Sequence, residues 1–172
     1  MLEQVRNAIR DVPDFPKPGI LFKDITPVLS RPELFRAVVD VFADHVKKLG
    51  VDKIAAIESR GFLFGAPVAQ ALGIGLVPVR KKGKLPYRTI EESYALEYGT
   101  ATLEVHEDAF AKGERVVIID DLLATGGTAA ATAKLAEKLG ASVSGFVFLV
   151  ELAFLDGKSR LGGRDVFAPI VF

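Results

Sequence analysis

The chain contains no cysteine and only two histidines, His45 and His106, among its 172 residues. Without cysteine there can be no disulfide framework, no zinc–thiolate site and no thiol nucleophile. The two histidines lie far apart in the sequence and suit surface positions better than a shared metal. The sequence therefore excludes thiol chemistry and argues against a metal site built from the chain's own side chains.

An excess of charge of either sign is also absent, because Lys plus Arg and Asp plus Glu both total 22. A balanced chain is not attracted as a whole to nucleic acid or to an anionic membrane. No apolar run approaches the length of about 18 residues that a membrane span needs, and the N-terminus does not resemble a secretion signal. We therefore expect a cytoplasmic protein with no membrane or nucleic-acid partner. The hydrophobic content of 49% predicts a single globular domain over residues 1–172.

Short apolar runs alternate with stretches of helical spacing along most of the chain. Strands are expected at residues 53–58, 76–80, 116–121, 144–151 and 165–172. Helices are expected at 2–9, at 61–72, at 129–139, and from a capping box at Ser30 and Glu33 to Leu49. Residues 94–98 and 100–105 flank Gly99 and predict a small hairpin. This order predicts an α/β fold whose mostly parallel, twisted sheet is flanked by helices.

Polar residues follow three of the predicted strands. They are Glu58–Gly61, Arg80–Lys81 and Asp120–Asp121. Because ligands of open α/β sheets bind beyond the carboxyl ends of the strands, we expect these segments to meet in one cleft. A basic, Gly/Pro-punctuated loop at 81–92 could close over that cleft.

The segment from Val116 to Thr128 is the most informative part of the sequence. A β-branched run ends in Asp120 and Asp121, and a Thr-Gly-Gly-Thr turn then leads into a helix. Backbone N–H groups at a helix N-terminus bind phosphate, and carboxylates accept hydrogen bonds from sugar hydroxyls. The segment lacks the P-loop lysine and the dinucleotide fingerprint, so its pattern favours a ribose 5-phosphate. The alternative is that two acids and two glycines only end a strand and turn the chain.

The nine residues from Asp120 to Thr128, DDLLATGGT, resemble the phosphoribosyl-diphosphate (PRPP) motif of the type I phosphoribosyltransferases, in the form found in adenine-specific members. Glu58–Gly65 resembles the family's diphosphate loop, and residues 79–99 resemble its catalytic loop. Gly19–Pro27 is similar to the hood that covers the base. The resemblance implies the type I phosphoribosyltransferase fold, with an N-terminal hood at about residues 13–30 and a flexible catalytic-loop hairpin at about 80–105.

The resemblance also implies a role for individual residues. The 5-phosphate is assigned to Ala124, Thr125, Gly126, Gly127 and Thr128, and the ribose to Asp120 and Asp121. The diphosphate is assigned to Ser59, Arg60, Arg80, Lys81 and Lys84, and adenine to Phe22, Lys23 and Leu123. Arg60 and Glu97 are the catalytic residues by this similarity, with Glu97 either assisting proton removal from adenine or stabilising charge on the sugar.

Plainer interpretations of Arg60, Phe22 and the basic loop stay open. Arg60 would serve equally in a surface salt bridge, Phe22 in a core, and the basic loop as a solvated run of charge. Lys23 stands where relatives usually carry arginine, so a side-chain role there is in doubt while a backbone contact is still possible.

The implied activity is transfer of phosphoribosyl from PRPP to adenine, which gives AMP and diphosphate, with Mg²⁺ carried by PRPP. Ala124 stands where hypoxanthine-guanine enzymes carry an acid, which favours adenine over a xanthine or guanine substrate. A PRPP-responsive regulator that binds nucleic acid is a further alternative, although it would need a basic face. The resemblance also implies a homodimer, which Phe62 and Phe64 fit no better than they fit a core.

Overall fold

A computed structural model describes residues 1–96 and 98–172, which form two units, Met1–Val41 and Phe42–Phe172. Glu97 lies outside the described residues. Within the described part, no helix is long and apolar enough to span a membrane. The cytoplasmic location stays a prediction from the sequence.

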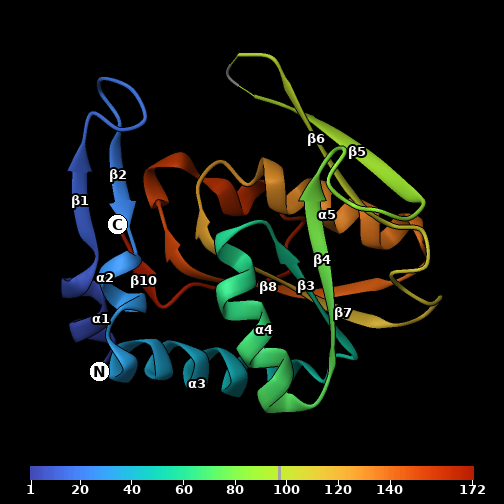
Figure 1. The fold of residues 1–172 in the computed structure, drawn as a ribbon, viewed down its shortest axis with the longest axis horizontal. Coiled ribbons are helices and arrows are strands. Elements are labelled where there is room, and N and C mark those ends of the chain that lie inside the picture. The colour runs from blue at the N-terminus through green and yellow to red at the C-terminus, as the bar shows by residue number, and fades with distance from the viewer. Residues whose placement is uncertain (97) are drawn as a thin grey trace. The chain divides into compact units, whose positions relative to one another are not determined.

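The larger unit is built on an eight-stranded sheet with the order β10-β8-β7-β3-β4-β6-β5, and β9 also pairs with β8 (Figure 1). The strands are β3 (Lys53–Ile57), β4 (Gly75–Lys81), β5 (Thr89–Ala95), β6 (Thr100–His106), β7 (Arg115–Leu123), β8 (Ser142–Glu151), β9 (Asp165–Phe167) and β10 (Ile170–Val171). All pairings from β4 through β3 and β7 to β8, β9 and β10 are parallel, whereas β6 pairs antiparallel with β4 and β5. The predicted parallel α/β sheet with an attached hairpin is confirmed.

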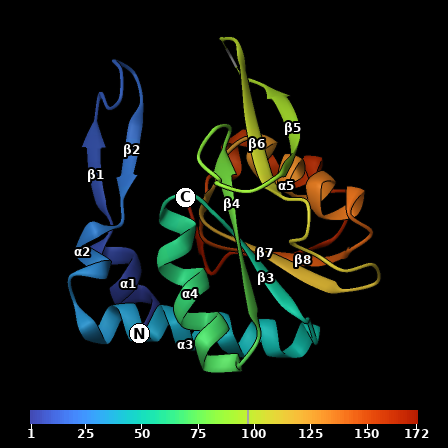
Figure 2. The ribbon, with the colours of Figure 1, turned by 45° about the vertical axis from the view of Figure 1, so that its right-hand side comes forward.

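Helices lie on both faces of this sheet. Ala55 and Ile57 of β3 belong to one buried cluster with α5 (Gly127–Lys138), whereas Gly65 of α4 (Arg60–Leu72) packs closely on Ala56. Since alternate residues of a strand point to opposite faces, α4 and α5 cover opposite sides of β3, as Figure 2 also shows. The C-terminal part of α3 (Pro32–Leu49) belongs to this unit, as do two short 3₁₀ helices, η1 (Ala153–Leu155) and η2 (Gly157–Arg160).

The smaller unit contains α1 (Leu2–Ala8), the antiparallel strands β1 (Arg10–Pro13) and β2 (Leu21–Asp24), α2 (Thr26–Leu29) and the first part of α3. The sequence predicted neither β1 nor β2, and Phe22 lies in β2 opposite Val12. The expected capping box of α3 was wrong. Ser30 does not cap α3 but ends α2, because Pro32 begins the next helix, a position where its fixed φ is favourable.

Element boundaries in the larger unit also differ from those predicted. The strand expected from Tyr94 begins at Thr89, β7 continues to Leu123, and α5 begins at Gly127. The expected terminal strand is two strands, since residues 168–169 separate β9 from β10. Pro78 lies opposite Ala56 of β3 and has no strand partner on its other side, because β4 pairs with β6 only at Arg80 and Lys81.

Candidate active site

The three polar segments predicted to converge do so at the carboxyl ends of β3, β4 and β7. These strands are neighbours in the sheet, and β3 lies parallel to both of the others. One pocket there is lined by Glu58, Ser59, Arg60, Lys81, Asp120 and Asp121. Three of the residues assigned to diphosphate, Ser59, Arg60 and Lys81, therefore lie beside the two acids assigned to ribose.

A second pocket surrounds the turn between β7 and α5. It is lined by Asp120, Leu122, Leu123, Ala124, Thr125, Gly126, Gly127, Thr128, Ala129 and Phe148. The N–H groups of the first helical turn lack carbonyl partners within a helix, and the positive end of the helix dipole lies at the same place. The pocket therefore suits a phosphate group, and it contains all five residues assigned to the 5-phosphate.

Gly126 and Gly157 let two backbone segments meet behind this turn. A Cβ atom on Gly126 would lie 2.4 Å from the carbonyl oxygen of Gly157, and one on Gly157 would lie 2.4 Å from that of Ala124. Gly126 also has a φ of +82°, which side chains disfavour. Sequence reasoning missed Gly157, because nothing in its neighbourhood indicates contact with a segment some thirty residues earlier.

The two acids at the end of β7 have different environments. Asp121 is buried and accepts a hydrogen bond from Nε of Arg60. Asp120 is only half-buried, lines both pockets, and accepts the backbone N–H of Asp121 on Oδ1 at 2.8 Å. Burial and the neighbouring Asp121 carboxylate raise the pKa of Asp120 well above its ordinary value. Asp120 is thus the acid placed between the two pockets, while Asp121 holds Arg60.

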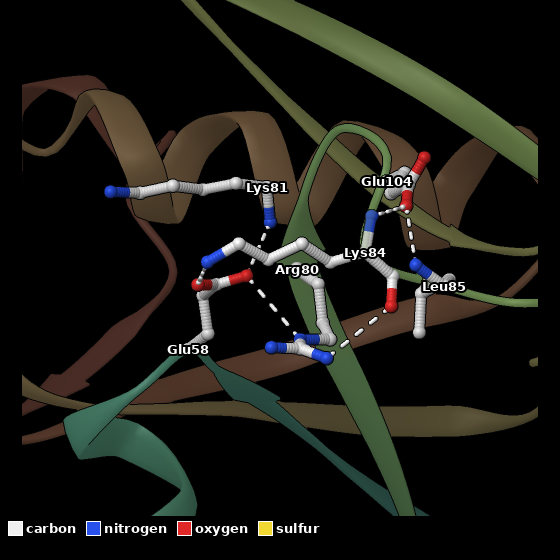
Figure 3. Close-up of polar contacts among 6 residues, drawn as sticks. All are labelled: Glu58, Arg80, Lys81, Lys84, Leu85 and Glu104. Carbon is white, nitrogen blue, oxygen red and sulfur yellow. Dashed lines mark hydrogen bonds and ion pairs between the residues drawn. The ribbon is translucent and has the colours of Figure 1, made fainter.

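The remaining cations assigned to diphosphate are not arranged alike. Lys84 Nζ lies 2.8 Å and Arg80 Nε 3.4 Å from the carboxylate of Glu58, so both side chains are paired within the protein. Lys81 lines the first pocket, and Figure 3 shows its side chain extending away from Glu58. The sequence placed Glu58 in the cleft and in the diphosphate loop but assigned it no role, because its partners lie more than twenty positions along the chain.

The loop that begins α4 has two further features. The peptide bond between Glu58 and Ser59 is cis. A Cβ atom on Gly61 would lie 2.8 Å from the carbonyl oxygen of Ile119. Gly61 is therefore needed for close packing of α4 on β7.

The residues assigned to adenine lie in both units. In the smaller unit, the ring of Phe22 makes an edge contact with Phe15, with centroids 5.1 Å apart. Lys23 Nζ lies 2.5 Å from Asp11 Oδ1, and only 9% of the Lys23 side chain is exposed. In the larger unit, Leu123 is buried at the end of β7 and lines the phosphate pocket.

The two histidines have structural partners. His45 stacks on Phe167 with ring centroids 4.2 Å apart, and its Nε2 lies 2.7 Å from Asp165. His106 accepts the backbone N–H of Tyr87 at 3.3 Å. Both rings are half-buried. Across residues 1–96 and 98–172, no group of three or more acidic or histidine side chains could hold a metal ion.

A phosphate pocket at a helix N-terminus, an acid pair and a cationic pocket, all on one edge of a parallel sheet, define a protein that binds a sugar phosphate bearing a second anionic group. The family model for the phosphoribosyl transferase domain matches residues 25–162. The chain is also 56% identical over 172 residues to the adenine phosphoribosyltransferase of Anaeromyxobacter dehalogenans, with both chains covered completely. The chain therefore belongs to the adenine phosphoribosyltransferase family, which confirms the resemblance seen in its motifs.

Solved structures agree with this assignment. A crystal structure of adenine phosphoribosyltransferase from Thermoanaerobacter pseudethanolicus superposes with a TM-score of 0.98 at 55% identity, and each chain is covered completely. The enzyme from Saccharomyces cerevisiae, solved with adenine and an imino-altritol bisphosphate, gives a TM-score of 0.94 at 42% identity, with 98% of each chain covered.

Proposed function

We propose that this chain transfers the 5-phosphoribosyl group of PRPP to adenine, forming AMP and diphosphate in purine salvage. The observation that carries the proposal is the position of Asp120 between two anion pockets. A ligand with one phosphate at the start of α5, its ribose at Asp120 and its diphosphate near Arg60 and Lys81 has the layout of PRPP. The yeast relative, solved with adenine and a bisphosphate, supports the same pair of ligands.

The pockets suit the bond changes of this reaction. A nitrogen of adenine forms a bond to carbon 1 of the ribose as the bond from that carbon to the diphosphate oxygen breaks. The leaving diphosphate takes the electron pair, and the attacking nitrogen loses its proton. Arg60 and Lys81 line the pocket where the negative charge gathers, so they stabilise the leaving group.

Glu97 is proposed, on the family resemblance, to accept the adenine proton or to stabilise the positive charge on the sugar. This residue lies outside the described residues, between β5 and β6. Phe22 is proposed to stack on adenine and Leu123 to contact it. Because the Lys23 ammonium is already held by Asp11, Lys23 is proposed to act through its backbone.

Mg²⁺ is proposed to arrive bound to PRPP, where it would neutralise charge on the diphosphate. Its donors would be the oxygens of PRPP, since oxygen ligands suit this ion, and Asp120 and Asp121 are assigned to the ribose. A homodimer is proposed on the resemblance alone. Phe64 gives no support for it, because this ring is buried in its own unit against Phe42.

Incubation with PRPP, Mg²⁺ and one purine at a time, followed by absorbance and by chromatography of the nucleotide product, tests the proposal. We expect AMP and diphosphate in equal amounts from adenine, and little product from guanine, hypoxanthine or xanthine. Product from guanine without product from adenine would contradict the base assignment. Absence of product with every purine would contradict the transferase activity itself.

A further inference from the structure

Glu58 is a buried carboxylate at the edge of a pocket that is otherwise suited to an anion. It follows β3 directly, and only 7% of its side chain is exposed. A negative charge beside a diphosphate would repel it unless nearby cations compensate. The position of Glu58 therefore needs an explanation that the proposed reaction does not supply.

Both oxygens of Glu58 hold the basic segment Arg80–Lys84. Oε1 accepts the backbone N–H of Lys81 at 2.7 Å and lies 3.4 Å from Nε of Arg80, while Oε2 accepts a hydrogen bond from Lys84 Nζ at 2.8 Å (Figure 3). Burial opposes ionisation, but the bonds from Lys84 and Lys81 outweigh it and lower the pKa of Glu58 below its ordinary value. The side chain is thus an anion at neutral pH.

A second carboxylate holds the far end of the same segment. Glu104 of β6 is buried, and its Oε1 accepts the backbone N–H groups of Lys84 at 3.1 Å and Leu85 at 2.9 Å. The segment leaves β4 after Lys81, and the Lys82 N–H still donates to the carbonyl oxygen of Thr102 in β6 at 3.0 Å. Glu58 and Glu104 add side-chain contacts to this backbone bond, and together they fix the turn.

These contacts also sort the four cations of the segment by role. Arg80 and Lys84 pair with Glu58, and Lys82 pairs with Glu91 at 3.0 Å. Among the described residues, no ion pair is formed by Lys81, which lines the pocket and whose side chain extends away from Glu58 (Figure 3). These ion pairs reduce the repulsion among the cations of the segment. Lys81, whose backbone N–H bonds to Glu58, is the cation whose charge is available to a ligand.

We propose that Glu58 is a positioning residue for the diphosphate of PRPP, holding the segment Arg80–Lys84 so that Lys81 faces the leaving group. This inference rests on the proposed function for the identity of the ligand. It changes the sequence-based assignment, in which Arg80, Lys81 and Lys84 were equivalent. Lys84 acts through its ion pair with Glu58, and Lys81 acts on the diphosphate.

The test is the substitution Glu58→Gln. The amide oxygen still accepts the Lys81 N–H, but the side chain no longer attracts Lys84 and Arg80. We expect the KM for PRPP to rise about tenfold, the scale of one lost charge-assisted hydrogen bond, with little change in the KM for adenine. Calorimetric titration with inorganic diphosphate and Mg²⁺ should show a matching loss of affinity.

A double-mutant cycle with Lys84→Met separates positioning from direct binding. Because Lys84 acts through Glu58, the double variant should lose no more diphosphate affinity than either single variant. Additive losses would overturn the proposal, since Lys84 would then bind the ligand independently. Glu91→Gln is the matched control, because it removes the partner of Lys82 on the same segment without touching the pocket.

Circular dichroism and the melting temperature of each variant exclude simple unfolding, and Glu58→Asp provides a second variant that keeps the charge. An unchanged or lower KM for PRPP in folded Glu58→Gln would refute the positioning role. Failure of the wild-type chain to form AMP would instead refute the proposed function, and the diphosphate titration would still test Glu58.

Discussion

The adjacent acids Asp120 and Asp121 have different electrostatic environments in the fold. Asp121 is neutralised by Arg60, whereas Asp120 is left next to a carboxylate with only partial access to water. The protein therefore keeps an electrostatically unfavourable carboxyl where both pockets meet. Such a group is expected at a binding site, because the hydroxyl groups of a ligand can donate further hydrogen bonds to this carboxylate.

Asp120→Asn should stabilise the unliganded protein and weaken PRPP binding. The folded-state pKa of Asp120 lies above the unfolded value, so the wild type loses stability as pH rises through the raised pKa. Asparagine does not ionise, so the free energy of unfolding of the variant should exceed that of the wild type at neutral pH, with the gain vanishing in acid.

Urea denaturation between acid and neutral pH measures this gain, with exposed Asp108→Asn as the control. A variant that is less stable than the wild type at neutral pH would show that the Asp120 carboxylate is favourable in the fold.

Gly126→Ala should disrupt the phosphate pocket. Alanine at positive φ costs about 1 kcal/mol, and its Cβ would also collide with the carbonyl oxygen of Gly157. Gly113→Ala isolates the first effect, because Gly113 has a φ of +85° and no atom within 4 Å of the added Cβ. Thermal denaturation should show a clearly larger loss of stability for Gly126→Ala than for Gly113→Ala. Equal losses would mean that the backbone at Gly157 moves away from the added Cβ at little cost.

At the scale of elements, the hairpin of β5 and β6 is attached to α5 at both ends of the helix. The Tyr94 hydroxyl lies 2.9 Å from the Thr128 hydroxyl in the first turn, and Glu92 Oε2 lies 2.5 Å from Lys138 Nζ in the last. The hydrogen bond from Lys138 lowers the pKa of Glu92. The strand that leads toward Glu97 is thereby linked to the helix that begins at the phosphate pocket.

Tyr94→Phe should weaken this link while keeping the ring against Gly127. Loss of one hydroxyl hydrogen bond costs about 1 kcal/mol, so we expect kcat/KM for PRPP to fall about fivefold. Tyr87→Phe is the control, since Tyr87 is exposed and its ring contacts only His106 among described aromatic groups. Steady-state kinetics with varied PRPP decide the point: equal kcat/KM in the wild type and Tyr94→Phe would show that the hairpin and the phosphate pocket act independently.

Across the whole molecule, the sheet and the ligand-binding edge were predictable because they depend on local patterns. Buried parallel strands are continuous apolar runs, and the acids or bases after them mark their carboxyl ends. The strands of the smaller unit were missed, since four-residue strands between prolines and glycines carry too little periodicity. The contacts of Glu58 and of Gly157 were missed for a different reason, because their partners are distant in sequence and are set by the tertiary fold.

The central claim is that the turn after β7 binds the 5-phosphate end of PRPP and the pocket at Arg60 binds its diphosphate. Calorimetric titration with ribose 5-phosphate alone tests this division most directly. We predict that the wild type and Glu58→Gln bind ribose 5-phosphate equally, while Gly126→Ala loses that binding. Ribose 5-phosphate affinity that survives in folded Gly126→Ala but is lost in Glu58→Gln would contradict the account.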